Sequence, residues 1–257
     1  MLQRILFVWL AFVMFHLYLR KWFAPGVALA GVCMLAAILP YTYISDLQES
    51  SSLLMLTFVV SLWALRDGPS WLFAVLLLLG ALNNETSLML PTAYFASRIQ
   101  GFHPKQLWAT GWRTLAVAAP AFAYTLAIRY ITRDRPHLGA VLQLGDNLRG
   151  VWLSLGISFF DYYRARYLFI FLIFNVLWIY AFLGLKNKPR FVQASLFIIP
   201  AFIIPHFITG VIFEVRQMIP LGFVIIPAAF FWLFPKSDVK ETEPSKEAGS
   251  AFSPASP

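Results

Sequence analysis

Charged residues and cysteine are both scarce in this chain of 257 residues. Only 12% of the residues are charged, 60% are hydrophobic, and Cys33 is the single cysteine. One cysteine excludes a disulfide within the chain and leaves the redox compartment open. No single soluble core could hide so much apolar surface, so the composition excludes a soluble domain. The sequence also lacks a glycine-rich phosphate loop, a nucleophile elbow and the Cys and His spacing of a metal site.

Long apolar runs make up most of the sequence. Crossing the hydrocarbon core of a membrane takes about 20 apolar residues in a helix, and most of the runs approach this length. They predict an all-α, polytopic transmembrane helical bundle with about eight to nine membrane segments. The candidate segments are residues 5–19, 25–44, 51–65, 70–82, 88–96, 114–131, 168–185, 191–213 and 217–234.

The two ends of the chain differ in character. The first apolar run is followed by Arg20 and Lys21, with no small-residue cleavage site, so we expect a retained helix. Residues 1–235 are predicted to form the transmembrane domain. Residues 236–257 are rich in Lys, Glu, Ser and Pro, which predicts a disordered cytoplasmic tail.

Glu85 stands out because it lies between two short apolar runs. On insertion scales, a carboxylate at the centre of a membrane helix costs about 2.5 to 3.5 kcal/mol, and such a residue usually marks a site, a pathway or a partner. Each flanking run rises only about 14 to 20 Å as a helix. The region is therefore either one long helix with a polar middle, or two partial helices that meet at a polar tip.

The positions of the basic residues favour the second alternative. If the pair around Glu85 goes in and comes back, one side of the membrane receives most of the basic residues, and the short connections on the other side hold only Arg4 and Arg216. A single crossing would instead put residues 98–113 and 186–190 outside, against the positive-inside rule. We therefore predict a re-entrant or hairpin pair and assign the basic side to the cytoplasm. The net charge of +8 then reflects topology and does not indicate a nucleic-acid partner.

This topology gathers a set of acidic and other polar residues, far apart in the sequence, on the non-cytoplasmic side. They are Asp46, Glu49, Asn83, Asn84, Glu85, Glu214 and Arg216. The connection 132–166 lies on the same side. Its second half, residues 146–166, mixes bulky apolar with charged side chains, which predicts an amphipathic helix along the membrane interface.

Each of these groups has a chemical interpretation and a structural one. Asn83, Asn84 and Glu85 suit the binding of sugar hydroxyls or a general base, or they only cap the second half-helix. Asp46 and Glu49 are three residues apart and suit a divalent cation or an acid and base pair, or they are the solvated start of the next helix.

The later polar residues allow similar alternatives. Glu214 and Arg216 are two residues apart, which predicts that they do not pair within a helix and that each has another partner. Arg216 either clamps a lipid phosphate or snorkels to headgroups. His206 either joins the same cavity or is a structural histidine, and Asn175 is predicted to form hydrogen bonds in helix packing.

Three short motifs resemble elements of a known class of membrane proteins. The apolar run 71–82 followed by Asn83-Asn84-Glu85-Thr86 and Pro91 is similar to a segment of bacterial multi-pass proteins of the GT-C-like class, in which the motif reads Asn-Arg-Glu-Thr. Glu214-Val215-Arg216 with Pro220 resembles their late Glu-x-Arg element, and Asp46-Leu47-Gln48-Glu49 resembles an earlier acidic one. Order and spacing agree over about two thirds of the chain.

The resemblance implies a glycosyltransferase of the bacterial inner membrane. Such proteins use a polyprenyl-phosphate-linked sugar on the non-cytoplasmic face, so a lipid-linked donor and membrane lipid are the implied partners. Glu85 or Asp46 would be the catalytic base and Arg216 would hold the donor phosphate. The other implied substrate-binding residues are Asn83, Asn84, Glu49, Glu214 and His206. No metal ligand is assigned, and a divalent cation remains an alternative cofactor.

Two departures from that class concern activity more than fold. Asn84 replaces the arginine of the central motif, and almost no loop separates the first two helices, where these enzymes usually carry a catalytic Asp. Two other classes of function therefore stay open. One is a transporter or flippase-like protein whose polar groups line a path. The other is an accessory scaffold whose polar groups lock helices together.

Overall fold

The computed structural model is helical in the part of the chain that it describes, which comprises residues 2–42, 50–99, 101, 103–133, 142–155, 166–210, 212 and 214–234. No strand occurs among these residues, which confirms the all-α prediction. The predicted tail, residues 236–257, lies outside them.

The helical elements follow one another with short connections. The first half of the chain contains α1 (Leu2–Leu19), α2 (Pro25–Thr42), α3 (Ser50–Asp67), α4 (Ser70–Asn83), the 3-10 helix η1 (Glu85–Met89), α5 (Leu90–Arg98) and α6 (Pro104–Ile131). The second half contains α7 (Leu144–Leu155), η2 (Arg166–Leu168), α9 (Phe169–Leu172), α10 (Leu177–Phe182), η3 (Leu185–Asn187), α11 (Arg190–Ser195), α12 (Ile198–Thr209), η4 (Val215–Leu221) and α13 (Gly222–Leu233).

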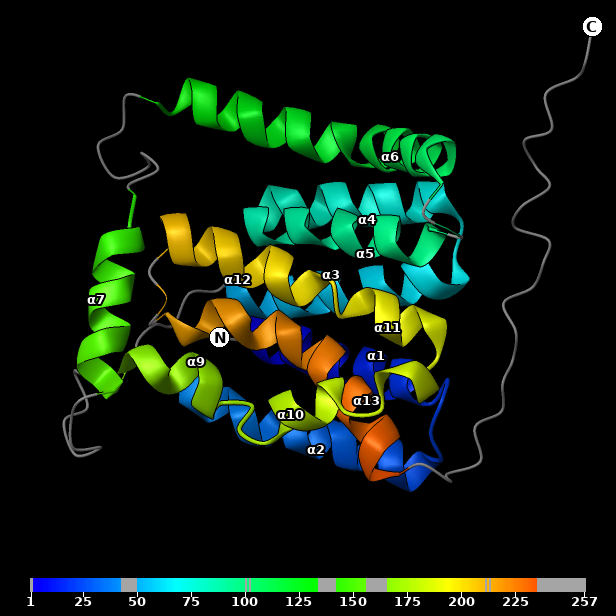
Figure 1. Ribbon diagram of the computed structural model, residues 1–257, viewed down its shortest axis with the longest axis vertical. Helices are drawn as coiled ribbons and strands as arrows, with labels where there is room; N and C mark the ends of the chain where they lie inside the picture. The colour runs from blue at the N-terminus through cyan, green and yellow to red at the C-terminus, as the bar shows by residue number, and fades with distance from the viewer. Residues whose placement is uncertain are drawn as a thin grey trace, which may run out of the picture.

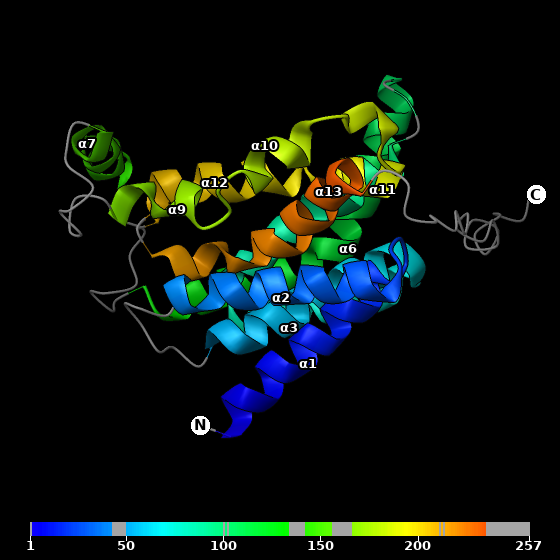
Figure 2. The same ribbon diagram turned by 90° about the horizontal axis from the view of Figure 1, so that it is seen from below.

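Most of these helices lie side by side along roughly one direction and form a bundle with two ends (Figure 1). At one end α4 passes into η1, α6 and α12 terminate, and η4 begins; we call this the polar end. The connections between α1 and α2, α3 and α4, α5 and α6, and η3 and α11 lie at the opposite end, which we call the basic end. The helix α7 stands across the bundle direction at the polar end (Figures 1 and 2).

The chain folds back on itself where α4 meets η1. The hydroxyls of Ser70 and Tyr94 are 3.0 Å apart, and the rings of Phe73 and Tyr94 stack with centroids 5.4 Å apart. The start of α4 therefore lies beside the second half of α5. Gly80 allows the close approach near the fold, because a Cβ there would lie 2.6 Å from Ser87 Oγ and 2.9 Å from Ser87 Cβ.

The centre of the bundle is the segment of η4 and α13. In an 18-residue window of the apolar stretch Val215–Leu233, 83% of the residues are buried inside the protein. Aromatic rings connect it to the first helix and to the connection that follows: Phe223 meets Phe15 of α1 edge-on at 5.0 Å between centroids, and Phe230 meets Phe23, between α1 and α2, at 5.9 Å. Such edge-to-face pairs add to the free energy of simple burial.

In the part of the chain that the structure describes, four helices are long and apolar enough to cross a membrane, namely Leu2–Leu19, Pro104–Ile131, Arg190–Thr209 and Val215–Leu233. Pro25–Pro40 and Ser70–Asn83 are shorter apolar helices. Many large apolar side chains face outward, such as Trp108 at 78% and Leu126 at 66% exposed. A surface this apolar fits lipid and not water. The length and composition of these helices make the chain a membrane protein.

One predicted membrane segment is not a continuous helix. Residues 168–185 were expected to form one span, but α9 ends at Leu172 and α10 begins only at Leu177. Asn175 lies between them with φ of 44°. This is the left-handed region that ends a helix, and Asn tolerates it better than most residues. The prediction that Asn175 lies inside a helix was therefore wrong.

The basic end is held together by charged and aromatic side chains. Lys21 pairs with Asp67 at 3.0 Å, and the Arg66 guanidinium lies 4.5 Å from the centroid of the Trp22 ring. Lys188 is only 5% exposed, and its ammonium donates to the carbonyls of Tyr180 and Ala181 at the end of α10. A cation at a helix C-terminus interacts favourably with the helix dipole. Burial lowers the pKa of Lys188 to about 8.

Candidate functional site

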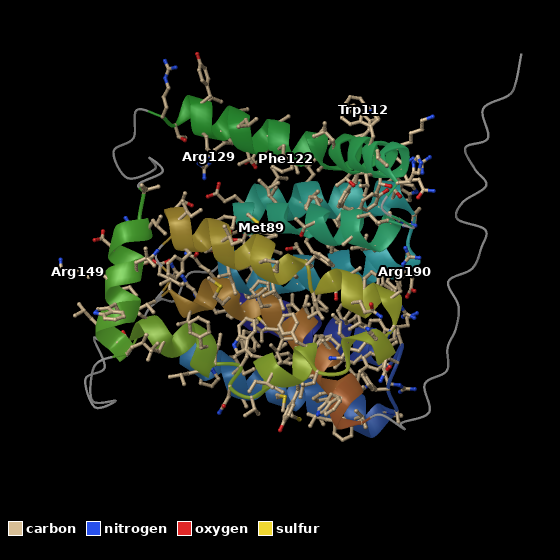
Figure 3. The ribbon with its side chains drawn as sticks, in the orientation of Figure 1. Met89, Trp112, Phe122, Arg129, Arg149 and Arg190 are labelled. Atoms are coloured by element: carbon tan, nitrogen blue, oxygen red, sulfur yellow. The ribbon has the colours of Figure 1, made fainter. Side chains whose placement is uncertain are left out.

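Glu85 opens η1 at the polar end and forms an ion pair with Arg129. The guanidinium donates through Nε to Oε2 at 3.0 Å and through Nη2 to Oε1 at 2.8 Å and Oε2 at 2.6 Å. Figure 3 shows Arg129 pointing from α6 toward the folded-back pair. This two-pronged geometry fixes the orientation of the carboxylate. Both side chains remain about half exposed, at 54% for Glu85 and 51% for Arg129.

The two asparagines before Glu85 hold the backbone of the turn. Asn84 is extended, with φ of −157° and ψ of 126°, and its side-chain oxygen accepts a hydrogen bond from the amide of Thr86 at 2.9 Å. This is the capping role that was one of its two interpretations. Asn83 Nδ2 donates to the carbonyl of Ser50 at 2.9 Å, so it joins the end of α4 to the start of α3.

His206 lies on α12, which packs against η1. Its Nδ1 is 2.7 Å from the carbonyl of Phe202, and its ring stacks on the Phe202 ring with centroids 4.7 Å apart. The structure thus places His206 on a helix that packs against η1 and gives it the local hydrogen bond of a structural histidine.

Glu214 and Arg216 are paired, contrary to the prediction that they do not pair with each other, and Glu214 also has a second partner. Arg216 Nη2 donates to Glu214 Oε2 at 3.1 Å, and Gln217 Nε2 donates to the same oxygen at 2.6 Å. The prediction assumed helical geometry at both residues. Glu214 instead precedes η4 with φ of −76° and ψ of 71°, so the rule for residues two apart in a helix does not apply. The side chain of Arg216 is only 7% exposed.

These residues form two groups at the same end of the bundle. The first contains Glu85, Arg129 and His206, and the second contains Glu214, Arg216 and Gln217. The helix α3, which Asn83 joins to the first group, also packs against η4 of the second. Asp46 and Glu49 lie outside the described residues. Among the described residues, no group of three or more His, Cys, Asp or Glu side chains could hold a metal ion.

Arg129 and Asn147 are the polar residues that sequence reasoning missed. Arg129 occupies the last turn of α6, where a lone arginine is typical of an interfacial residue. Asn147 on α7 is 2% exposed, and its Nδ2 donates to the carbonyls of Phe207 and Gly210, each at 2.8 Å. Neither sequence neighbourhood indicates its partner. The one available signal was the position of Arg129 directly before the connection 132–166, which the sequence predicts to be non-cytoplasmic.

The fold and this cluster define a helical membrane protein with an oriented carboxylate, guanidinium groups and a histidine gathered at one end. A carboxylate can accept a proton and guanidinium groups can bind phosphate oxygens. Comparison with known protein families, curated protein sequences and solved structures finds no match to the chain.

Proposed function

We propose that the protein is a GT-C-like membrane glycosyltransferase that uses a polyprenyl-phosphate-linked sugar at its polar end. In this proposal the polar end faces the non-cytoplasmic side of a bacterial inner membrane. The shorter helices join the four long ones to make about eight to nine membrane segments, with α4 and η1–α5 as the hairpin pair. The fold-back at Asn84 supports this topology, because it returns the chain to the basic end before Arg98.

The reaction requires a base and a cation at different places. An acceptor hydroxyl attacks the anomeric carbon of the sugar, its proton passes to a carboxylate, and the bond from that carbon to the phosphate oxygen breaks. Polyprenyl phosphate then leaves as an anion. Glu85 is the proposed base, with Asp46 as the alternative, and Arg216 is the proposed partner of the departing phosphate. Asn83, Asn84, Glu49, Glu214 and His206 are the proposed contacts to the substrates.

The observation that carries the proposal is the gathering of polar residues from distant parts of the chain at one bundle end. Glu85 and Arg129 are 44 positions apart and form three hydrogen bonds. His206 and the Glu214–Arg216 pair come from later segments. The opposite end carries the ion pair of Lys21 and Asp67, together with Lys188, which binds a carbonyl at the end of α10. This asymmetry suits an enzyme that works from one face of a membrane.

A second candidate, an accessory scaffold, is favoured by how completely these groups bind one another. The side chain of Glu85 is hydrogen-bonded to Arg129, that of Asn84 to the amide of Thr86, and that of Asn83 to the carbonyl of Ser50. Arg216 is also almost buried at 7% exposure. In a scaffold such bonds would only hold helix ends together.

Transfer measured in liposomes separates the two candidates. The purified full chain is reconstituted and supplied with radiolabelled polyprenyl-phosphate hexoses and pentoses together with envelope glycan acceptors, and release of polyprenyl phosphate is measured. Glu85→Gln and Arg216→Ala are each expected to abolish transfer at unchanged protein level. Wild-type protein without transfer from any donor, or normal transfer by both variants, would reject the assignment and leave the scaffold.

A further inference from the structure

The helix α7 buries its polar and small residues and exposes its apolar ones. The residues buried against the rest of the protein are Asn147, Gly150 and Ser154. The large apolar residues on the outside are Leu148 at 55%, Trp152 at 76%, Leu153 at 45% and Leu155 at 67% exposed. This is the reverse of an amphipathic helix on a water-soluble protein, whose apolar face packs on the core.

The buried face is firmly attached to the bundle. Asn147 Nδ2 donates to the carbonyls of Phe207 and Gly210 at 2.8 Å each, and Asn147 Oδ1 accepts from the amide of Ile212 at 3.4 Å. One side chain therefore satisfies three backbone groups where α12 ends. Gly150 lies directly against the ring of Tyr167, and any larger residue there would overlap that ring.

The direction of α7 sets which way its apolar face points. The helix lies across the bundle at the polar end in both ribbon views (Figures 1 and 2). Arg149 points away from the bundle (Figure 3), and Asp146 is exposed as well. Successive residues are about 100° apart around a helix. The side of α7 opposite Arg149 therefore lies between the buried residues, Asn147, Gly150 and Ser154, and the stripe of exposed apolar residues. The stripe is therefore centred at roughly a right angle to Arg149 and faces sideways.

We infer that α7 is an in-plane membrane helix whose stripe, Leu148, Trp152 and Leu155, occupies the boundary between lipid headgroups and acyl chains. Lipid is the occupant, because the candidate spans Pro104–Ile131 and Arg190–Thr209 both end at the polar end, where that boundary must lie. Tryptophan is also enriched at this depth. Asn147 anchors the helix, so it fixes the end of α12 and the chain before Glu214 at headgroup level. The inference does not depend on glycosyl transfer.

Spin labels in liposomes of phosphatidylcholine and phosphatidylglycerol test this inference on the full chain. Cys33 is the only cysteine and is exposed, so the background carries Cys33→Ser. Single cysteines are placed on the stripe, as Leu148→Cys and Trp152→Cys, and at the exposed charged positions, as Asp146→Cys and Arg149→Cys. Labels on the stripe should be accessible to oxygen and lie about 5 to 10 Å below the phosphates. Labels at the charged positions should be accessible to a water-soluble nickel chelate.

The same measurement distinguishes lipid from other occupants. If labels at 146 and 148, which lie on nearly opposite sides of the helix, are equally accessible to the nickel chelate, α7 lies in water and the inference is rejected. A label at 152 that is shielded from both relaxers and broadened by a neighbouring label indicates a second copy of the chain, which also rejects it.

The anchor is tested by its own substitution. Asn147→Ala should broaden the depth distribution of the label at 152 and raise its nickel accessibility. Ser154→Ala, which removes a hydroxyl that donates to the Gly150 carbonyl within the same helix, should leave the depth unchanged. An unchanged depth profile in Asn147→Ala would show that Asn147 does not hold the helix in place.

Discussion

The catalytic and the structural interpretation of the polar end predict losses of different size when Glu85 or Arg129 is replaced. Exposed ion pairs contribute about 0.2 to 1 kcal/mol, and both partners here are half exposed. Losing about 1 kcal/mol changes the ratio of folded to unfolded protein only about fivefold. Removing a general base lowers the rate about 100- to 10,000-fold. The two interpretations therefore predict losses of clearly different size.

The experiment compares Glu85→Gln, Arg129→Gln and the double variant for glycan transfer in liposomes and for melting temperature in detergent. A catalytic Glu85 predicts a loss of 100-fold or more in Glu85→Gln, as expected for a general base, and a much smaller loss in Arg129→Gln. All three variants should melt within a few degrees of one another, because a half-exposed pair is lost in each.

Exchanging the two residues, Glu85→Arg with Arg129→Glu, supplies a matched control. It keeps an ion pair between η1 and α6 but removes the carboxylate from the turn. Transfer should stay lost while the melting temperature recovers. Equal small losses in both single variants, no further loss in the double variant, and recovery of transfer on exchange would refute a catalytic Glu85 and leave only the pairing.

Two further predictions concern the fold. Gly80→Ala should destabilise the protein by about 1 to 3 kcal/mol, because the added Cβ would overlap Ser87. Gly26→Ala is the matched control and should be neutral, because a Cβ at that position would have no atom within 4 Å. Adding Ser87→Gly to Gly80→Ala should recover part of the loss in melting temperature. Burial lowers the pKa of Lys188 from 10.5 to about 8, so between these values the unfolded chain binds more protons and stability rises with pH. The melting temperature of the wild type should therefore rise relative to that of Lys188→Met from pH 7.5 to 9.5. If the melting temperatures of the two proteins change in parallel with pH, the pKa of Lys188 is not lowered in the folded protein.

The helical character of the protein could be predicted from the sequence because it depends on local composition. Runs of apolar residues leave the backbone no partner in lipid except itself, so they predict helices wherever they occur. The break at Asn175 depends instead on one residue that adopts a positive φ, and Asn occurs in helices as well as at their ends. Apolar periodicity does not distinguish these cases.

The candidate site was less predictable because its contacts join distant segments. Glu85 was found from its cost at membrane depth, but its partner Arg129 is 44 residues away and has the sequence context of an ordinary interfacial arginine. The Glu214 and Arg216 pair was mispredicted because a rule for regular helices was applied to residues at a helix boundary. Charge placement can assign residues to one side, whereas pairing depends on packing that no local pattern encodes.

The position of α13 at the centre of the bundle has a consequence for biosynthesis. Its partners α1, α2, α10 and α11 all leave the ribosome before it does. During translation, the rings of Phe15 and Phe23 must therefore contact lipid or an insertion factor until Phe223 and Phe230 have been synthesised and inserted. We expect chains that stop before residue 222 to be recognised by membrane quality control and degraded, even though most of their helices have already been inserted.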